Sequence, residues 1–296
     1  MAEAARRWEI DFYQLDAGGF KGEMIQVMTG AGMVGQSRFM GGVEQRGAVP
    51  AGFRTFGIPL PDCTPFRWRG RLLDANHLLM FPKSGELDSR SFAGFHVHPV
   101  SIPEPLLAKL AVKSHYDWFF DGGERVVCCG QGVIRALRAV AASVISVSSR
   151  SEDPGAGKIA GDLMMELSEG LMAALDGGRT APVRPMAQLR RRALKDSLEI
   201  IRSPENRVWR VAELCEEVGV SRRTLQYAFE EEFQVSPKQY LQARRLMAAK
   251  RRLETAGPGA QVGQIASQLG FWHMGQFAAD FGSHFGKRPS DVISKF

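Results

Sequence analysis

Two short segments near the C-terminus carry side chains that suit hydrogen bonding to the polar edges of nucleic-acid bases. The first segment places Arg222, Arg223, Gln226 and Tyr227 at helical spacing on one face. An arginine can donate two hydrogen bonds to a guanine edge, and a glutamine amide can pair with adenine. This row of side chains predicts direct readout of a base sequence.

The second segment has a different outward face. It presents His273, Met274 and Gln276, followed by Ala279 and Asp280. These residues offer few strong base contacts and almost no positive charge. We therefore expect the first segment to supply most of the direct readout, while the second contributes shape fit, anchoring to the phosphate backbone and limited reading.

A metal site is a second kind of chemistry that the sequence suggests. In the motif HVHP, His96 and His98 point to the same side of an expected strand and could bind a metal ion. Such a centre also needs a carboxylate and a later histidine. Glu104 is separated from the strand by two prolines, and His115 falls in an expected helix. We interpret the pair as ordinary strand histidines and expect no metal and no cofactor.

Other polar candidates also have two interpretations. The adjacent Cys128 and Cys129 could sense oxidants, but we favour two small buried residues. A group of arginines could receive an acidic ligand, although a solvated strand face explains them more simply; these are Arg46, Arg54, Arg67, Arg69 and Arg71. The chain has four cysteines without the paired spacing of a zinc site, so we expect reduced thiols.

Both outward rows belong to copies of one repeated frame. Each copy is a short helix, a turn with a glycine and a longer helix with an apolar row. The matching positions are Val211 and Val262, Leu214 and Ile265, Cys215 and Ala266, Gly219 and Gly270, Leu225 and Phe277, Phe229 and Phe281, and Phe233 and Phe285. The buried row must repeat, whereas the outward row is free to differ. This layout predicts helix-turn-helix motifs at about 208–233 and 262–285, each with its second helix in the major groove.

Residues 186–296 resemble the DNA-binding domain of the AraC/XylS family of bacterial transcription regulators. The segment LCEEVGVSRRTLQYAFEEEFQVSPKQYLQARRLMAAKRRL resembles the first half and the connecting helix, and VGQIASQLGFWHMGQFAADFGSHFGKRPSDV resembles the second half. The resemblance implies base contacts from Arg222, Arg223, Gln226, Tyr227, His273, Met274 and Gln276. Ala279 stands where the family sometimes has a basic residue, which weakens the expected readout by the second half.

The charge distribution agrees with a polyanionic partner for one half of the chain. The whole sequence has a net charge of +6. Residues 1–185 hold 20 basic and 20 acidic residues, whereas residues 186–296 hold 18 basic and 12 acidic residues. The entire positive excess therefore belongs to the C-terminal segment, as expected of a domain that binds nucleic acid.

The N-terminal half predicts a different architecture. Short strands separated by glycine and proline run from Phe20 to about Val100, and helices follow to about Leu175. One helix carries a row that is a core or dimer stripe: Ile159, Leu163, Leu167, Leu171 and Leu175. The resemblance implies a cupin-like β-barrel with dimerisation helices in residues 1–175. Together with a linker at 176–185 and the helical domain 186–296, this predicts an α+β fold.

The sequence predicts a cytoplasmic, sequence-specific DNA-binding transcription regulator that is not an enzyme. Its N-terminus has no apolar signal region, and no run reaches the ~20 apolar residues of a membrane span. We expect double-stranded DNA, a small-molecule effector, RNA polymerase and a second copy of the chain as partners, and activation rather than repression. Two alternatives remain: a metal-dependent cupin enzyme fused to a DNA-binding module, and a constitutive architectural DNA binder.

Overall fold

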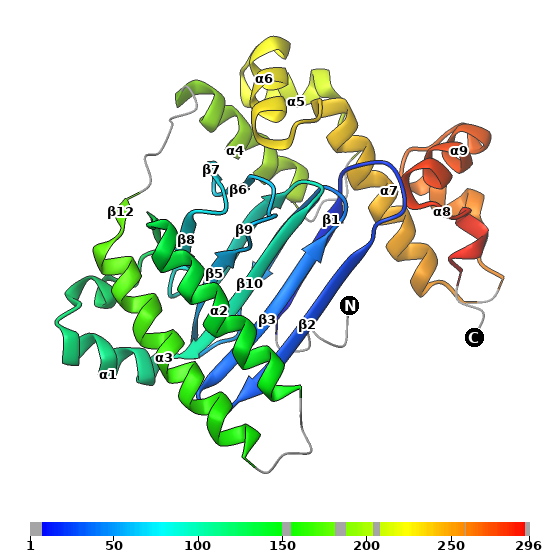
Figure 1. Cartoon of the computed structure of the whole chain (residues 1–296). Coiled ribbons are helices and arrows are strands. Elements are labelled where there is room, and N and C mark those ends of the chain that lie inside the picture. Colours follow the sequence, from blue (N-terminus) through cyan, green and yellow to red (C-terminus); the bar gives the residue numbers. More distant parts are fainter. Residues whose placement is uncertain (1–7, 150–154, 181–187, 204–207, 258, 294–296) are drawn as a thin grey trace. The chain divides into compact units, whose positions relative to one another are not determined.

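The computed structural model describes residues 8–149, 155–180, 188–203, 208–257 and 259–293. The chain forms two compact units. Unit 1 consists of Met1–Phe12 and Lys21–Val183, and unit 2 consists of Tyr13–Phe20 and Arg184–Phe296. Strands followed by helices in the sequence give an α+β fold, as predicted (Figure 1).

Unit 1 is built on strands that form two sheets. The strands are β1 (Glu9–Gln14), β2 (Gly22–Thr29), β3 (Gly32–Phe39), β4 (Val43–Ala48), β5 (Phe53–Pro59), β6 (Phe66–Trp68), β7 (Arg71–Leu73), β8 (His77–Met80), β9 (Glu86–Ser91), β10 (Phe95–Pro103), β11 (Arg125–Cys128) and β12 (Arg179–Thr180). The seven-stranded sheet has the order β12-β11-β8-β5-β10-β3-β2, and the five-stranded sheet the order β1-β4-β9-β6-β7. In the described residues these sheets remain separate and do not close into a barrel.

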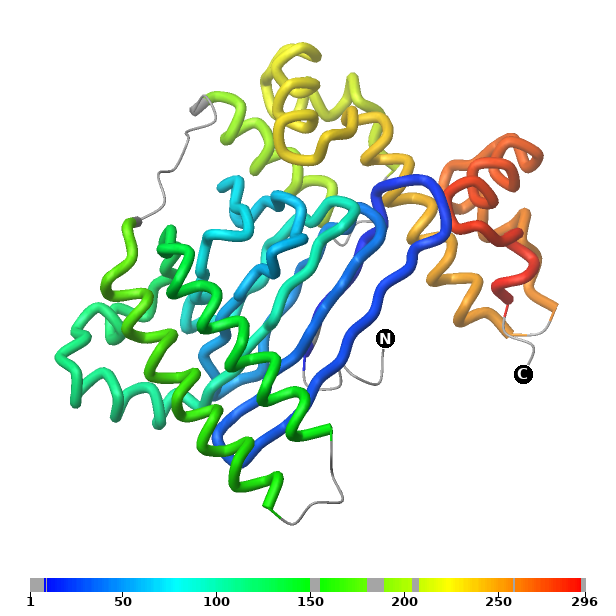
Figure 2. Tube along the Cα trace, in the orientation of Figure 1, coloured from blue at the N-terminus to red at the C-terminus, as the bar shows by residue number. Residues whose placement is uncertain are grey.

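Helices cover the seven-stranded sheet of unit 1. They are α1 (Glu104–Ser114), the 3₁₀ helix η1 (Asp117–Asp121), α2 (Gln131–Ser148) and α3 (Ala156–Gly177). The helices α2 and α3 lie side by side across this sheet (Figures 1 and 2). The segment 176–185, expected as a linker, begins in the last turn of α3 and includes β12, while residues 181–185 lie outside the described part of the chain.

The apolar stripe of α3 is mostly core of unit 1. Leu167 and Leu171 have no exposed surface, and they pack with Phe56 of β5 in the core cluster. Leu163 is half-buried against the same cluster, and only Ile159 is half exposed. Of the two interpretations of this stripe, a dimer interface is therefore wrong for its central residues, because their side chains are already enclosed by their own chain.

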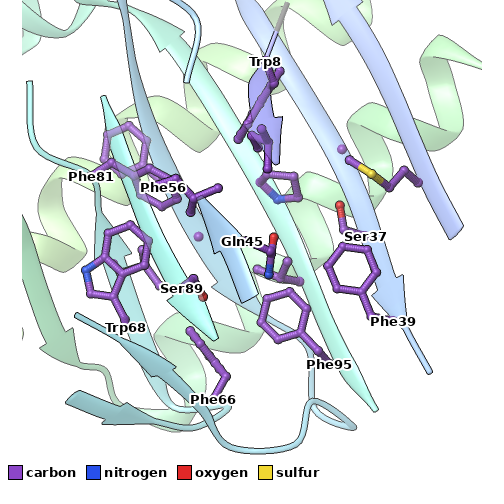
Figure 3. A pocket seen from close by; sticks show the side chains of 18 of the residues that line it. Trp8, Ser37, Phe39, Gln45, Phe56, Phe66, Trp68, Phe81, Ser89 and Phe95 are labelled. Atoms are coloured by element: carbon purple, nitrogen blue, oxygen red, sulfur yellow. The ribbon is translucent and has the colours of Figure 1, made fainter. Parts of the chain in front are cut away.

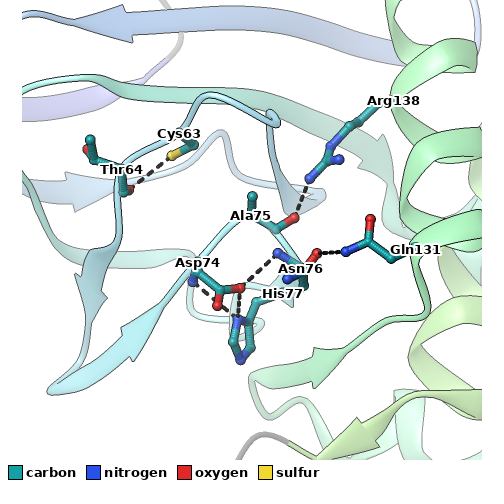
Figure 4. Close-up of polar contacts among 8 residues, drawn as sticks. All are labelled: Cys63, Thr64, Asp74, Ala75, Asn76, His77, Gln131 and Arg138. Carbon is teal, nitrogen blue, oxygen red and sulfur yellow. Dashed lines mark hydrogen bonds and ion pairs between the residues drawn. The ribbon is translucent and has the colours of Figure 1, made fainter.

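Polar contacts fix α2 to the loop before β8 (Figure 4). The Arg138 guanidinium donates to the carbonyl oxygens of Pro59, at 2.7 Å for Nε, and Ala75. Gln131 Nε2 donates to Asn76 Oδ1 at 2.8 Å. The Arg138 charge on this otherwise apolar helix therefore has a structural use, because it satisfies two backbone carbonyls beside α2.

Unit 2 is helical, and it contains the two helix pairs that the repeated frame predicted. Its described helices are α4 (Gln188–Arg202), α5 (Val211–Val218), α6 (Arg222–Phe233), α7 (Pro237–Thr255), α8 (Val262–Gln268), α9 (Met274–Phe285) and the 3₁₀ helix η2 (Pro289–Asp291). The Ser221 hydroxyl accepts a hydrogen bond from the Thr224 amide at 3.1 Å and caps α6. Gly219 ends α5 at a φ of 70°, in the left-handed region. The glycine of the repeated frame thus lies at the turn between the two helices, as predicted.

The segment Tyr13–Phe20 belongs to unit 2 although it lies far away in sequence. Leu15 is buried in the core cluster of the first motif with Leu194 and Phe229. The Gln14 amide donates to the His284 carbonyl at 2.7 Å. These contacts connect the segment to both halves of the helical unit, and the sequence pattern gave no sign of them.

The buried His284 makes the stability of unit 2 depend on pH. Burial lowers its imidazole pKa, against the opposing effects of the Gln14 carbonyl and the Asp16 carboxylate. The unfolded chain has the ordinary histidine pKa of about 6.5. Below that pH the unfolded chain binds a proton that folded unit 2 excludes, so the free energy of unfolding falls as the pH falls.

We expect His284→Gln to reduce this loss of stability on acidification. Thermal unfolding followed at about pH 7.5 and about pH 5.5, either side of the ordinary histidine pKa, measures the effect. The wild type should lose more of its melting temperature than the variant does. Equal losses in the two proteins would contradict the assignment to His284, since His98, whose pKa burial also lowers, is present in both.

Candidate nucleic-acid interface

The four predicted base-reading residues of α6 lie on its outer face. Arg222, Arg223 and Tyr227 are exposed, and Gln226 is half-buried. Arg223 Nη2 donates to the Tyr227 hydroxyl at 3.1 Å, and its guanidinium lies 5.4 Å from the centre of that ring. The structure thus brings Arg223 and Tyr227 together into one exposed cationic and aromatic surface.

Gln226, another of the predicted base-reading residues of α6, has an acidic neighbour one turn away. Gln226 Nε2 donates to Glu230 Oε1 in the free protein. A base contact by Gln226 therefore requires the amide to leave this carboxylate. The sequence placed both residues on the outward face but gave no indication that they bind each other.

The predicted readers of α9 are exposed as well. His273 precedes the helix as its N-cap residue, and Met274 is its first residue. Gln276 Nε2 donates to Asp280 Oδ1 at 2.7 Å. Asp280 Oδ2 also accepts from Gln242 of α7 at 2.8 Å. The Asp280 carboxylate thereby ties α9 to α7, which is a structural role that sequence reasoning missed.

An open groove in unit 2 adds residues that the sequence analysis did not select. Its lining includes Trp272, whose surface is 77% exposed, directly before the α9 reader segment. The same groove contains Trp209 and several cations, namely Arg210, Arg222, Lys238 and Arg245. Cations beside aromatic rings suit contacts with phosphates and sugars. The sequence feature that could have indicated this groove is Trp272, which stands at an outward position of the second copy of the repeated frame.

Part of the positive charge of α7 is held against aromatic rings of unit 2. The Arg244 and Arg251 guanidiniums lie 4.1 and 4.9 Å from the centre of the Tyr13 ring. Arg245 lies 5.2 Å from the Phe271 ring, and burial lowers its pKa without removing its charge. These arginines therefore contribute to packing in addition to the field around the helical unit.

The two histidines of HVHP bind groups of unit 1. His96 Nδ1 lies 2.8 Å from Asp62 Oδ1, and its Nε2 lies 2.9 Å from Gln36 Nε2. His98 Nδ1 lies 2.9 Å from the Gly35 carbonyl oxygen, to which it donates. Within the described residues, no group of three or more histidine, cysteine, aspartate or glutamate side chains is arranged to hold a metal ion.

Three of the five arginines considered for an acidic ligand pair with acidic residues of unit 1. Arg54 is buried and pairs with Glu104 at 3.2 Å. Arg69 and Arg71 pair with Glu124 at 3.5 and 3.3 Å. The interpretation as a simple solvated strand face is thus wrong for Arg54, because its guanidinium is enclosed and neutralised within unit 1.

The cysteines of the described chain are free thiols. Cys129 is buried and Cys128 half-buried. Burial raises the pKa of the Cys63 thiol to about 11 and raises the pKa values of Cys129 and Cys215. These groups therefore stay protonated near neutral pH, where a thiol is a weak nucleophile.

A family model matches the helical unit, and known regulators match a part of the chain of similar length. Residues 214–295 match a family model described as a helix-turn-helix domain. A probable thc operon regulatory protein of Rhodococcus erythropolis is 37% identical over 84 residues, which are 28% of this chain and 25% of that protein. The XylDLEGF operon transcriptional activator 1 of Pseudomonas putida is 34% identical over 83 residues, again 28% of this chain and 25% of that protein. The match thus spans a quarter of the length of these relatives.

A solved structure resembles a larger share of the chain. The AraC-like transcriptional activator CuxR aligns with 90% of this chain and 93% of its own, at 16% identity and a TM-score of 0.42. In the described part of the chain, no helix has both the length and the apolar character of a membrane span.

The matched region and the repeated frame coincide. Residues 214–295 run from within α5 through η2, and so they include α6 and α9, the helices that carry the exposed outward rows. The C-terminal part of the chain therefore contains a helix-turn-helix domain.

Proposed function

We propose that the whole protein is a transcription regulator that binds a specific sequence of double-stranded DNA and activates transcription. The observation that carries the proposal is the exposed outer face of α6, where Arg222, Arg223 and Tyr227 stand over a buried apolar row. Arginines at the start of a recognition helix suit guanine edges in the major groove. The two related proteins, an operon regulatory protein and an operon transcriptional activator, support the same function.

Two reader helices suit two successive segments of the major groove, about 34 Å apart on one face of the DNA. In this proposal Arg222, Arg223, Gln226 and Tyr227 contact bases from α6. His273, Met274 and Gln276 make weaker contacts from α9. The cations of the groove beside Trp272 neutralise phosphates between the two major-groove segments.

Unit 1 is the sensor in this proposal. Its two sheets and covering helices form a cupin-like unit that binds a small-molecule effector and contributes to a homodimer. A ligand with different affinities for two conformations shifts the population that binds DNA. Activation then requires contact with RNA polymerase in the cytoplasm. The support for a ligand is a cavity of about 70 Å³ between the sheets, lined by residues of both (Figure 3).

Selection of binding sites from random duplex DNA by the full-length protein tests the proposal. We expect enrichment of a bipartite site with two parts about one helical turn apart. The affinity for this site should fall steeply between about 50 and 200 mM salt, because bound phosphates release counterions. Enrichment of no sequence at low salt would contradict specific binding and favour the constitutive architectural alternative.

A further inference from the structure

The apolar cavity of unit 1 is lined by a side-chain nitrogen, Gln45 Nε2, that has no hydrogen-bond partner among the described residues. Gln45 of β4 is 8% exposed and lines the cavity between the two sheets. Its Nε2 is buried and finds no hydrogen-bond acceptor among the described residues. In Figure 3 the amide lies among aromatic rings that include Phe39 and Phe95. An unsatisfied buried amide costs free energy, so its presence needs an explanation.

The rest of the cavity wall restricts what can satisfy this amide. The wall is mainly aromatic and aliphatic, and it includes Trp8, Phe66 and Trp68. None of the described lining residues carries a charge. Ser89 lies opposite Gln45 on the neighbouring strand β9, but its hydroxyl donates to the Arg67 carbonyl at 3.2 Å. A charged ligand would therefore lose its hydration without gaining a counter-ion.

We infer that this cavity binds a small, uncharged, mainly apolar molecule with one hydrogen-bond acceptor, to which Gln45 Nε2 donates. The ligand class is that of compact ketones, ethers or esters rather than carboxylates. The volume of about 70 Å³ is suited to a molecule of a few heavy atoms. This inference rests on the proposed function in one respect, since it names the chemical class of the proposed effector.

Three probes of similar skeleton separate the contributions of shape, acceptor and charge. Cyclopentanone carries a neutral acceptor, methylenecyclopentane has the same shape with CH₂ in place of oxygen, and cyclopentanecarboxylate carries a charge. Ligand-observed NMR titration of the full-length protein measures each affinity. We expect both neutral probes to bind and the carboxylate to bind more weakly than the ketone.

The variant Gln45→Met tests the role of the amide, since methionine has a similar length and no donor. A net hydrogen bond between neutral groups corresponds to about a three- to tenfold change in affinity. The ratio of ketone to hydrocarbon affinity should therefore fall by about three- to tenfold in this variant. Gln36→Met is the matched control, because Gln36 contacts His96 and lies outside the cavity lining. It should leave the ratio unchanged, and circular dichroism confirms that both variants fold.

Several results would overturn the inference. These are an unchanged ratio in Gln45→Met, a carboxylate that binds as tightly as the ketone, or no binding of either neutral probe. The last result would leave an ordered water as the partner of Gln45. The same preparations are assayed for DNA binding, which keeps the two proposals distinguishable. Specific DNA binding without probe binding would contradict only the proposed ligand class. Probe binding without DNA binding would contradict only the proposed function as a transcription regulator.

Discussion

Leu167→Asp is expected to unfold unit 1 rather than to separate two protomers. Leu167 has no exposed surface and packs in the cluster that α3 shares with α2 and the seven-stranded sheet. An aspartate there must either ionise without a partner or remain protonated in an apolar core. Both alternatives are costly, and we expect a loss of about 4 kcal/mol or more in the free energy of unfolding.

Ile159→Asp is the matched control for this prediction. Ile159 lies on the same stripe of α3 but is 50% exposed, so a carboxylate there remains hydrated. We expect its stability to change by about 0.5 kcal/mol or less, as for an ordinary surface substitution. Chemical denaturation followed by tryptophan fluorescence compares the two variants, because Trp68 and Trp118 belong to unit 1. A stable, folded Leu167→Asp protein that sediments as a monomer would restore the stripe as a dimer interface.

The stripe illustrates what periodicity can and cannot predict. A step of four along α3 correctly identified one apolar face, because residues at this spacing share a side of a helix. The same pattern arises whether the face packs on its own sheet or on a second chain. The packing of α3 against α2, β2 and β11 of its own chain distinguishes the two, and that packing depends on contacts between residues far apart in sequence.

The helices of unit 2 were predictable because their signals are local. Ser221, Gly219 and the row from Leu225 to Phe233 fix the ends and the buried face of α6 within a few residues. The position of Leu15 in the same core had no local signal. Leu15 fell within the predicted N-terminal domain 1–175 only because of its position in the sequence.

For the candidate interface, exposure was predictable but pairing was not. The repeated frame placed all seven reader residues outward, because the buried row is fixed by the core. The contacts of Gln226 with Glu230 and of Gln276 with Asp280 depend on rotamers, which sequence spacing does not determine. These contacts matter, since each amide must leave a carboxylate before it can bind a base.

The two reader helices should contribute unequally to DNA binding. Arg223 is exposed, carries a full charge, and in the free protein donates to a neutral hydroxyl, that of Tyr227. We expect Arg223→Ala to weaken operator binding by about 1–3 kcal/mol and to relax the preference at one or two base pairs. Arg192→Ala controls for the loss of one positive charge, because Arg192 is a surface residue of α4 with an 83% exposed side chain.

The glutamines provide a matched comparison between the helices. Gln226 and Gln276 each donate to an acid one turn later, so replacement by alanine removes the same intramolecular bond. Their surroundings differ, since Arg222 and Arg223 stand beside Gln226, whereas His273 and Met274 precede Gln276. Asp280 also keeps its bond to Gln242 and remains near the DNA-facing side of α9. Gln276→Ala should therefore weaken DNA binding less than Gln226→Ala does.

Binding of the purified protein to a library of single-base operator variants at fixed salt measures both effects. The site enriched from random duplex DNA serves as the operator. The affinity of each protein variant is measured for every single-base change in that operator. Positions under α6 should be stringent in the wild type and should lose stringency in Arg223→Ala. Positions under α9 should tolerate more substitutions throughout, because the His273 and Gln276 side chains offer weaker and more costly contacts. Equal or greater stringency under α9 would mean that the outward rows do not determine the readout, and that the groove around Trp272 or the shape of the DNA contributes it instead.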